Sequence, residues 1–431
     1  MNAIDPEQAR QFAVQVVRQL RHAGFPALWA GGCVRDALLH LCPKDYDIAT
    51  GATPDQIREV FRHRRTLAVG QAFGVITVLG SRQSGHVEVA TFRRDAAYSD
   101  GRHPDQVTFS TAEEDAQRRD FTINGLFFDP LEERVFDYVG GQADLRGRLV
   151  RAIGDPSERI AEDKLRMLRA VRFAANFAFA LDPDTLAAVQ RQAHEIVIVS
   201  AERVSAELRQ MLVHRHRRRA LELLQEAGLL EVLLPEFREL APNGGSCPGD
   251  SSWPSTLAVL ARLHEPTFAV ALAALVREFV HPTGELVPEV ERICDRLRLS
   301  NTERVGAEWL LLHEPELRRA RQLPWPHLQR LLTHPRIDEL LCYARAVAEV
   351  CDGQAAEIDY CCQKLSLPRA ELDPPPLLTG HDLQAHGIRP GPIYQDLLRG
   401  VRDAQLEQRI HTPQEALELA LRLGAQLRAT D

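Results

Sequence analysis

The stretch LWAGGCVRDALLHLCPKDYDIAT, residues 28–50, carries a Gly-Gly pair, an arginine and two aspartates in that order. In a β-strand, residues i and i+2 point to the same face, so Asp45 and Asp47 project together and Tyr46 points away. Two carboxylates side by side repel each other unless a cation lies between them. Mg²⁺ prefers such oxygen ligands, and a pair of Mg²⁺ ions activates an attacking hydroxyl while holding a leaving phosphate. The stretch therefore predicts a two-metal site at Asp45 and Asp47, with an ordinary surface D-x-D motif as the alternative.

The glycines and the arginine of the same stretch predict a phosphate site. A turn at Gly31 and Gly32 lets backbone N–H groups approach a triphosphate, and the helix that follows presents its positive N-terminus. Arg35 lies in that helix, where its guanidinium suits a phosphate oxygen. The alternative is a tight turn that serves packing alone.

Composition indicates a globular protein of several domains. The chain has 431 residues, of which 45% are hydrophobic and 26% charged. Its eight cysteines form no C-x-x-C pair and no cluster with zinc spacing, and no signal peptide or long apolar run is evident, so we expect a reduced, cytoplasmic protein without a membrane partner. The net charge of −8 weighs against a nucleic-acid partner, although local basic runs oppose this average.

The chain changes character along its length. Residues 5–23 have apolar side chains at helical spacing, and this pattern ends at Gly24. It predicts an amphipathic helix with a glycine at its C-terminal end. Short β-branched runs dominate residues 66–138, whereas helical patterns prevail after about residue 155. The predicted fold class is α+β, with a mixed or antiparallel sheet in the N-terminal part followed by an all-helical remainder.

A third carboxylate falls in one of the predicted strands. In HVEVATFR, residues 86–93, Glu88 lies on the face opposite Val87 and Val89. On a strand next to Asp47, it would complete the metal site and help to deprotonate an attacking 3′-hydroxyl. An edge-strand glutamate in solvent is the alternative.

Five ordered motifs resemble a known family. GGCVRD with DYDIAT, HVEVATFR, YSDGRHPDQVTF, RRDFTINGLFFDP and ERIAEDKLRMLRAVRFAA together resemble the class II tRNA nucleotidyltransferase and poly(A) polymerase family, of the polymerase β superfamily. The resemblance covers residues 25–210 closely and the tail more loosely. It implies a catalytic head at 1–148, a helical neck at 149–212, a helical body at 213–350 and a helical, tRNA-binding tail at 351–431.

The resemblance also implies roles for individual residues. The arginine matching Arg119, in RRDFTINGLFFDP, contacts the bound nucleotide. In EDKLRMLRAVR, residues 162–172, members of the family use the aspartate and arginine that match Asp163 and Arg166 as a protein template for CTP and ATP. Arg169 and Arg172 follow on the same predicted helix and are assigned to the nucleotide site with them.

Base chemistry agrees with a template made by Asp163 and Arg166. A carboxylate accepts a hydrogen bond from the exocyclic amino group of cytosine or adenine, and a guanidinium donates to ring nitrogens and carbonyls. Uracil and guanine present a carbonyl where the amino group should be, so they are excluded. The alternative is a solvated helix face with Arg172 partly buried beside Leu165 and Leu168.

The expected activity is addition of CCA, or of its terminal A alone, to tRNA 3′ ends from CTP and ATP with release of diphosphate. The alternatives are a bacterial poly(A) polymerase, an A-adding enzyme and, more distantly, a non-catalytic RNA-binding protein. A CC-only enzyme is disfavoured because DAAYSDGRHPDQV, residues 95–107, has full length. The partners expected are tRNA and the two nucleotides, with two Mg²⁺ as cofactor and no protein partner implied. The basic run VHRHRRRALELL, residues 213–224, is either an RNA contact or a solvated helix face.

Overall fold

The structure is a computed structural model, and it describes residues 4–68, 74–95, 107–238, 253–279, 288–386 and 393–430. The chain forms two compact units, residues 1–239 and 240–431. The predicted division into four domains is finer than this and stays a prediction. Most of the predicted full-length segment 95–107 lies outside the described residues.

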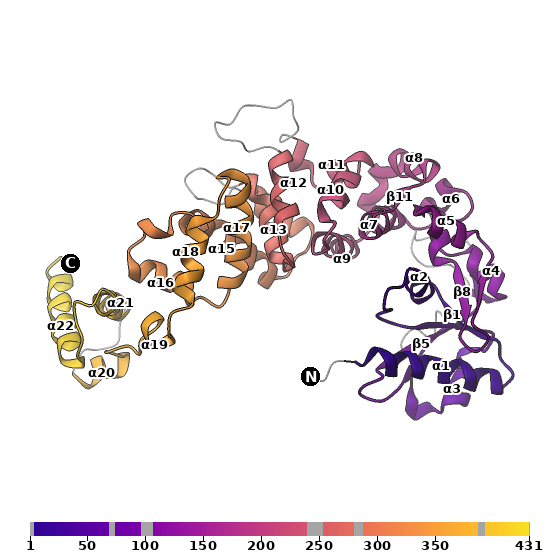
Figure 1. Cartoon of the computed structure of the whole chain (residues 1–431), viewed down its shortest axis with the longest axis horizontal. Coiled ribbons are helices and arrows are strands. Elements are labelled where there is room, and N and C mark those ends of the chain that lie inside the picture. Colours follow the sequence, from indigo (N-terminus) through magenta and orange to yellow (C-terminus); the bar gives the residue numbers. More distant parts are fainter. Residues whose placement is uncertain are drawn as a thin grey trace. The chain divides into compact units, whose positions relative to one another are not determined.

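The first unit contains a mixed sheet with the strand order β3-β4-β5-β2-β1-β8-β9 (Figure 1). Strands β2 and β5 are parallel, and the other neighbours are antiparallel. Its strands are β1 (Ala27–Ala30), β2 (Asp47–Thr50), β3 (Thr66–Leu67), β4 (Val75–Leu79), β5 (His86–Thr91), β8 (Leu126–Asp129) and β9 (Arg134–Asp137). The mixed sheet expected in the N-terminal part is confirmed.

Helix α1 (Pro6–His22) confirms the predicted amphipathic helix. The Asp5 carboxylate caps its N-terminus by accepting from the backbone N–H of Glu7 and Gln8, and a proline occupies the first helical position. The buried residues of α1 are Ala13, Val16, Val17 and Leu20. Helix α1 packs on strands β1, β2 and β5, and α3 (Pro54–Phe61) packs on β4 and β5.

The rest of the first unit is mainly helical. Its further helices are α2 (Gly32–Leu38), α4 (Ala112–Gln117), α5 (Gly141–Gly147), α6 (Pro156–Glu162), α7 (Arg166–Phe177), α8 (Pro183–Gln192), α9 (Ala201–Leu212), α10 (Arg217–Glu226) and α11 (Leu230–Leu233). Two short strand pairs accompany them, β6 (Arg93–Asp95) with β7 (Val107–Phe109) and β10 (Leu149–Val150) with β11 (Ala180–Leu181). The β10-β11 pair lies in the region expected to be all-helical. The pair forms because the segment that follows α7 lies beside the segment that precedes α6.

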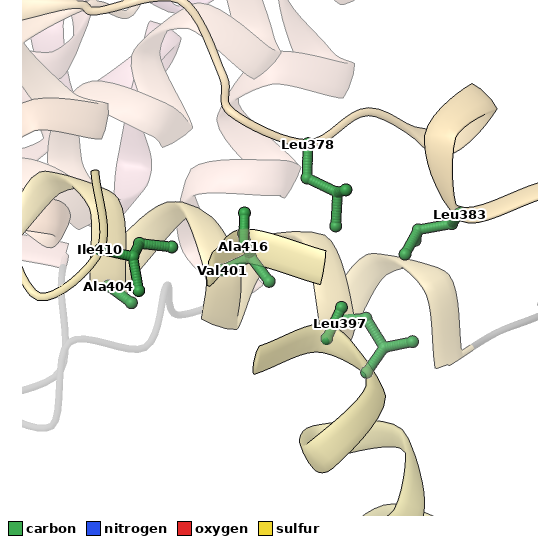
Figure 2. Packing of buried hydrophobic residues seen from close by; sticks show 8 residues of the cluster. Leu378, Leu383, Leu397, Val401, Ala404, Ile410 and Ala416 are labelled. Atoms are coloured by element: carbon green, nitrogen blue, oxygen red, sulfur yellow. The ribbon is translucent and has the colours of Figure 1, made fainter. Parts of the chain in front are cut away.

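The described residues of the second unit form helices only. They are α12 (Trp253–Arg262), α13 (Phe268–Val276), α14 (Pro288–Arg296), α15 (Asn301–Leu317), α16 (Trp325–Leu332), α17 (Ile337–Cys351), α18 (Ala356–Leu365), α19 (Arg369–Leu372), α20 (Gly380–Ala385), α21 (Ile393–Leu406) and α22 (Pro413–Thr430). Figure 2 shows the cluster that joins α20, α21 and α22, in which Leu383, Leu397 and Val401 are buried. The helical character predicted for this part of the chain is confirmed.

Candidate active site

The two aspartates of the opening stretch meet the third carboxylate across neighbouring strands. Asp47 is the first residue of β2 and pairs in parallel register with Glu88 of β5. Asp45 lies just before the strand, which begins later than predicted. Tyr46 is buried on the opposite side, with its ring centroid 4.7 Å from that of Trp29. The packing of Tyr46 therefore orients both aspartates to the other face, as their spacing predicts.

The carboxyl group of Asp47 has a raised pKa. Asp47 is exposed at the surface, but the protein around it displaces much of its water, which is the largest cause of a raised pKa. The charges of Glu88 and Asp45 add to this effect, and the pKa of Asp47 rises from 3.8 to about 6 against the opposite effect of Arg119. Among the described residues, no side chain makes a hydrogen bond or ion pair with the carboxylates of Asp45, Asp47 or Glu88. The site thus lacks the positive charge that its carboxylates require.

Gly31 makes room for Arg119. Its φ of +74° is in the left-handed region that favours glycine, and a Cβ at Gly31 would lie 2.8 Å from Nη1 of Arg119. Nε and Nη2 of Arg119 donate to Oδ2 of Asp115 at 3.2 and 2.9 Å, and its guanidinium carbon lies 4.9 Å from the ring centroid of Phe127. Arg119 is therefore held against the glycine turn, with Gly32 as the first residue of α2.

A chain of polar side chains connects α2 with α7. Nη1 of Arg35 donates to Oδ1 of Asn124 at 2.6 Å, and Nδ2 of Asn124 donates to Oδ1 of Asp120 at 3.1 Å. Oδ2 of Asp120 then accepts from Nη2 of Arg169 at 2.6 Å. Burial by itself raises the pKa of Asp120, but Arg169 and the other donors outweigh it and lower this pKa to about 2. Asp120 is thus a permanent anion that fixes Asn124 and Arg169.

The predicted template helix is broken at Asp163. Helix α6 ends at Glu162, Asp163 is extended with φ −145° and ψ 105°, and α7 begins at Arg166. The Asp163 carboxylate accepts from the backbone N–H of Leu165 at 3.0 Å and from Nη2 of Arg203 at 2.8 Å. The expectation of one continuous helix is wrong, because the Asp163 side chain bonds the backbone N–H of Leu165, and this local bond competes with continuation of the helix.

Arg166 is buried rather than exposed on the helix face, which corrects the sequence-based expectation. Nη1 of Arg166 donates to Oε2 of Glu162 at 2.5 Å and to the carbonyl of Arg159 at 2.8 Å. The simple surface pair of Asp163 with Arg166 is therefore absent, since each has another partner. Arg172 is buried as predicted, and its Nε donates to Oε2 of Glu207 at 2.5 Å.

The side chains of these elements line one cavity of about 760 Å³. Its lining comprises Gly31, Gly32, Arg35, Asp45, Asp47, Arg118, Arg119, Asp120, Asn124, Asp163, Leu165, Arg166, Arg169, Arg172, Phe173, Arg203 and Gln210. Every predicted site residue except Glu88 belongs to this lining. Glu88 lies beside Asp47 on the neighbouring strand β5 and acts on it through its charge.

Several lining or supporting residues were not foreseen from the sequence. Asp115 pairs with Arg118 and Arg119, and its pKa is lowered because both arginines outweigh the effect of its burial. Arg203 and Glu207, both of α9, reach Asp163 and Arg172. The only available signal was their i, i+4 spacing on one helix face, which is too common to identify a site.

The described residues contain neither a cluster of metal-ligating side chains nor a helix that could span a membrane. Across the described ranges, no three or more His, Cys, Asp or Glu side chains are grouped to hold a metal ion by themselves. None of the helices described combines the length and apolar character needed to cross a bilayer.

Two family models match the first unit. Residues 27–151 match the poly A polymerase head domain, and residues 178–240 match a probable RNA and SrmB-binding site of polymerase A. The cavity residues from Gly31 to Arg119 lie within the first match.

Known relatives match about half of the chain. The CCA-adding enzyme of Staphylococcus epidermidis is 38% identical over 214 residues, which are 49% of this chain and 52% of that enzyme. For the CCA-adding enzyme of Bacillus subtilis the identity is 41% over 232 residues, 54% of this chain and 57% of that enzyme. The matched part of the chain thus spans only about half the length of these curated relatives.

Solved structures match nearly the whole chain. The structure of the Bacillus stearothermophilus CCA-adding enzyme in complex with CTP has a TM-score of 0.74 at 26% identity and covers 98% of this chain and 99% of that one. The Thermotoga maritima CCA-adding enzyme complexed with tRNA has a TM-score of 0.63 at 18% identity, covering 97% and 96% of the two chains, and this likeness shows the fold alone.

Proposed function

We propose that this chain belongs to the class II tRNA nucleotidyltransferase and poly(A) polymerase family and adds CCA, or its terminal A, to tRNA 3′ ends from CTP and ATP. The observation that carries this proposal is the shared cavity, in which the carboxylates of Asp45 and Asp47 face the same space as Asp163 and Arg166. A nucleotide whose base binds Asp163 and Arg166 has its triphosphate near Asp45 and Asp47.

Mg²⁺ fits the carboxylates of this site. Asp45 and Asp47 offer oxygen ligands without a cationic side chain bonded to them, and the pKa of Asp47 is raised by loss of surrounding water first and then by the charges of Glu88 and Asp45. Mg²⁺ is commonly held by one or two carboxylates together with water and substrate phosphates, so a larger cluster of protein ligands is not required. When bound, two Mg²⁺ ions would neutralise the triphosphate and favour the ionised 3′-hydroxyl.

The residues of the chain position the two reactants. Arg35 and Arg119 contact the triphosphate or sugar beside the Gly31 turn, while Asp163 and Arg166 bind the edge of the base. The 3′-oxygen of the tRNA attacks the α-phosphorus of the nucleotide, a new P–O bond forms, and the bond to the β-phosphate oxygen breaks to release diphosphate. Glu88, next to Asp47, is the proposed acceptor of the hydroxyl proton.

The Asp163 carboxylate has capacity to read a base. Its two oxygens accept from Leu165 and Arg203, and each retains a lone pair for the amino group of cytosine or adenine. Arg166 keeps N–H groups beyond those that donate to Glu162 and Arg159. Arg169 and Arg172 line the same cavity and are held there by Asp120 and Glu207.

Labelled CTP and ATP, Mg²⁺ and tRNAs that end at the discriminator base, C or CC test the proposal. A CCA-adding enzyme extends all three tRNAs to CCA, an A-adding enzyme extends only the last, and a poly(A) polymerase adds A repeatedly. We expect Asp47→Ala to retain less than about a tenth of the wild-type rate, since a lost metal ligand raises the barrier by more than about 1.4 kcal/mol. The proposal fails if the wild-type protein transfers neither nucleotide, or if Asp47→Ala remains fully active.

A further inference from the structure

Four aromatic rings form a row at α7. Phe173 and Phe177 are four residues apart and therefore share one face of the helix, with ring centroids 6.2 Å apart and ring planes at 13°. The ring of Phe121 stands nearly perpendicular to that of Phe173, with centroids 5.7 Å apart, and Phe179 packs on Phe177 at the same centroid distance. Of these four residues, Phe173 alone belongs to the cavity lining. The half-buried Phe177 thus has no part in the site as described above.

The guanidinium of Arg35 lies on this row of rings. Its central carbon is 4.5 Å from the ring centroid of Phe177 and 5.3 Å from that of Phe173. Both distances are within the about 6 Å at which the face of an aromatic ring attracts a cation. The Arg35 side chain is only 10% exposed, so water screens this attraction little. The rings therefore stabilise a cation that borders the nucleotide cavity.

Hydrogen bonds hold only the edge of the Arg35 guanidinium. Nε and Nη2 donate to Oδ1 of Asp36 at 2.9 and 2.7 Å, and Nη1 donates to Oδ1 of Asn124 at 2.6 Å. These bonds take three of the five N–H groups. Within the described ranges no further acceptor bonds this side chain, so two N–H groups remain for a phosphate oxygen. Bonds at the edge let the planar group tilt, whereas rings packed against it oppose tilting.

The ring contact joins two elements that carry different parts of the site. Arg35 belongs to α2, which follows the glycine turn, and the two rings belong to α7, whose first residue is Arg166. The hydrogen-bonded chain that also connects α2 with α7 passes through two intermediate side chains. The contact of Arg35 with Phe173 and Phe177 is direct. It therefore sets how the Arg35 guanidinium is placed relative to the residues of α7 that line the cavity.

We propose that Phe177 is a positioning residue for nucleotidyl transfer. Together with Phe173 it holds the Arg35 guanidinium so that the triphosphate of a nucleotide, whose base is bound at α7, is aligned for attack at its α-phosphorus. This inference rests on the proposed function and adds a residue outside the cavity lining that acts through Arg35. Misalignment slows the reaction more than it weakens binding, since a displacement of about 1 Å can lower a rate about a hundredfold.

The variant Phe177→Leu tests this role, because it removes the ring at a half-buried position and keeps an apolar side chain. We expect kcat for CTP and for ATP to fall about tenfold, while KM for each nucleotide stays within about twofold. Phe177→Tyr keeps the ring and should retain the wild-type kcat. The matched control is Phe128→Leu, since Phe128 is also half-buried but packs on Trp29, with ring centroids 5.6 Å apart, and is outside the cavity lining. It should have the wild-type kcat, and the Tm of each variant verifies its fold.

Two further measurements show whether the ring acts through Arg35. In an Arg35→Gln background, which keeps both aspartates and Arg119, Phe177→Leu should change the remaining kcat by less than about twofold. Phenylalanines with increasing numbers of fluorine atoms at position 177 should lower kcat stepwise, because fluorine weakens the negative face of the ring while its shape is nearly kept.

The inference is overturned if folded Phe177→Leu has the wild-type kcat, if Phe128→Leu loses as much, or if Phe177→Tyr fails to restore the rate. It is also overturned if the fluorinated series shows no trend, or if Phe177→Leu lowers kcat equally with and without Arg35. Absence of CTP and ATP transfer by the wild-type protein would be a different result, since it removes the proposed function.

Discussion

At the scale of the residue, the protonation of Asp47 controls the proposed metal site. Loss of surrounding water and the charge of Glu88 raise its pKa to about 6. Because this folded-state pKa exceeds the ordinary value of 3.8, the contribution of Asp47 to stability is complete below 3.8 and is lost as the pH rises through about 6 in the absence of metal. Mg²⁺ binds the carboxylate form, so its affinity falls as the pH drops below about 6. We expect the rise in Tm caused by Mg²⁺ to be larger at about pH 8 than at about pH 5.

The variant Asp47→Asn isolates this effect. It removes the ionisation but keeps the shape of the side chain, so without metal its Tm should exceed that of the wild type at about pH 8 and match it at about pH 4. Its Tm should also respond less to Mg²⁺ than that of the wild type. A Mg²⁺-induced shift in the wild type that is equal at both pH values would contradict the assignment of Asp47 as a ligand.

The residues of the site show which of their features could be predicted from the sequence. The alternation in DYD predicts that Asp45 and Asp47 share a face, because strand geometry depends only on local spacing. The partners of the arginines were not predictable in this way. Arg203 binds Asp163, and Glu207 binds Arg172, through contacts that arise only after distant segments pack together. Such contacts carry no fixed spacing in the chain.

At the scale of the element, we propose that the break between α6 and α7 sets the choice of nucleotide. It turns the Asp163 carboxylate into the cavity beside Arg166 instead of leaving it on a helix surface. In Asp163→Ala the acceptor for the amino group is lost, while Arg35, Asp45 and Asp47 still hold phosphates and metal. We expect discrimination of CTP and ATP against UTP and GTP to fall about ten- to a hundredfold, or about 1 to 3 kcal/mol, with a smaller loss of rate for CTP. Competition assays with all four triphosphates measure this ratio.

Glu158→Ala is the matched control, because Glu158 is an exposed carboxylate on α6 outside the cavity lining. It should leave nucleotide preference unchanged. The double variant with Arg166→Ala should admit UTP and GTP further, but it also removes one of the two ion-pair partners of Glu162, the other being Arg159, so its stability has to be measured separately. Unaltered exclusion of UTP and GTP by folded Asp163→Ala would reduce this residue to a helix-capping role.

The break itself was missed because the residues 158–175 have one continuous helical pattern. Leu165, Leu168 and Val171 are buried as that pattern predicts, so the periodicity identified the core face correctly. Periodicity does not register a single extended residue when the hydrophobic face resumes after it. The competing interaction is local, an aspartate side chain that bonds a nearby backbone N–H group, and aspartate does this at helix starts in many proteins.

At the scale of the whole molecule, the nucleotide cavity lies entirely within the first compact unit. All its lining residues fall between Gly31 and Gln210, and the unit comprises residues 1–239. We therefore expect a fragment of residues 1–239 to fold and to bind CTP with a Kd within about threefold of the full chain, a difference of about 0.7 kcal/mol. Calorimetry measures this affinity, and circular dichroism verifies the fold.

In the fragment of residues 1–239, we expect nucleotide transfer to tRNA to be impaired while CTP binding is retained. The predicted tRNA-binding tail, residues 351–431, lies in the second unit, so we expect its removal to take away RNA contacts that act together with those of the first unit. We expect kcat/KM for tRNA to fall by at least about tenfold, or about 1.4 kcal/mol, while the KM for CTP is preserved. The same fragment with Asp163→Ala is the control for specific nucleotide binding. A folded fragment that no longer binds CTP would show that the cavity depends on the second unit, and one that transfers to tRNA at the full rate would remove the predicted role of the tail.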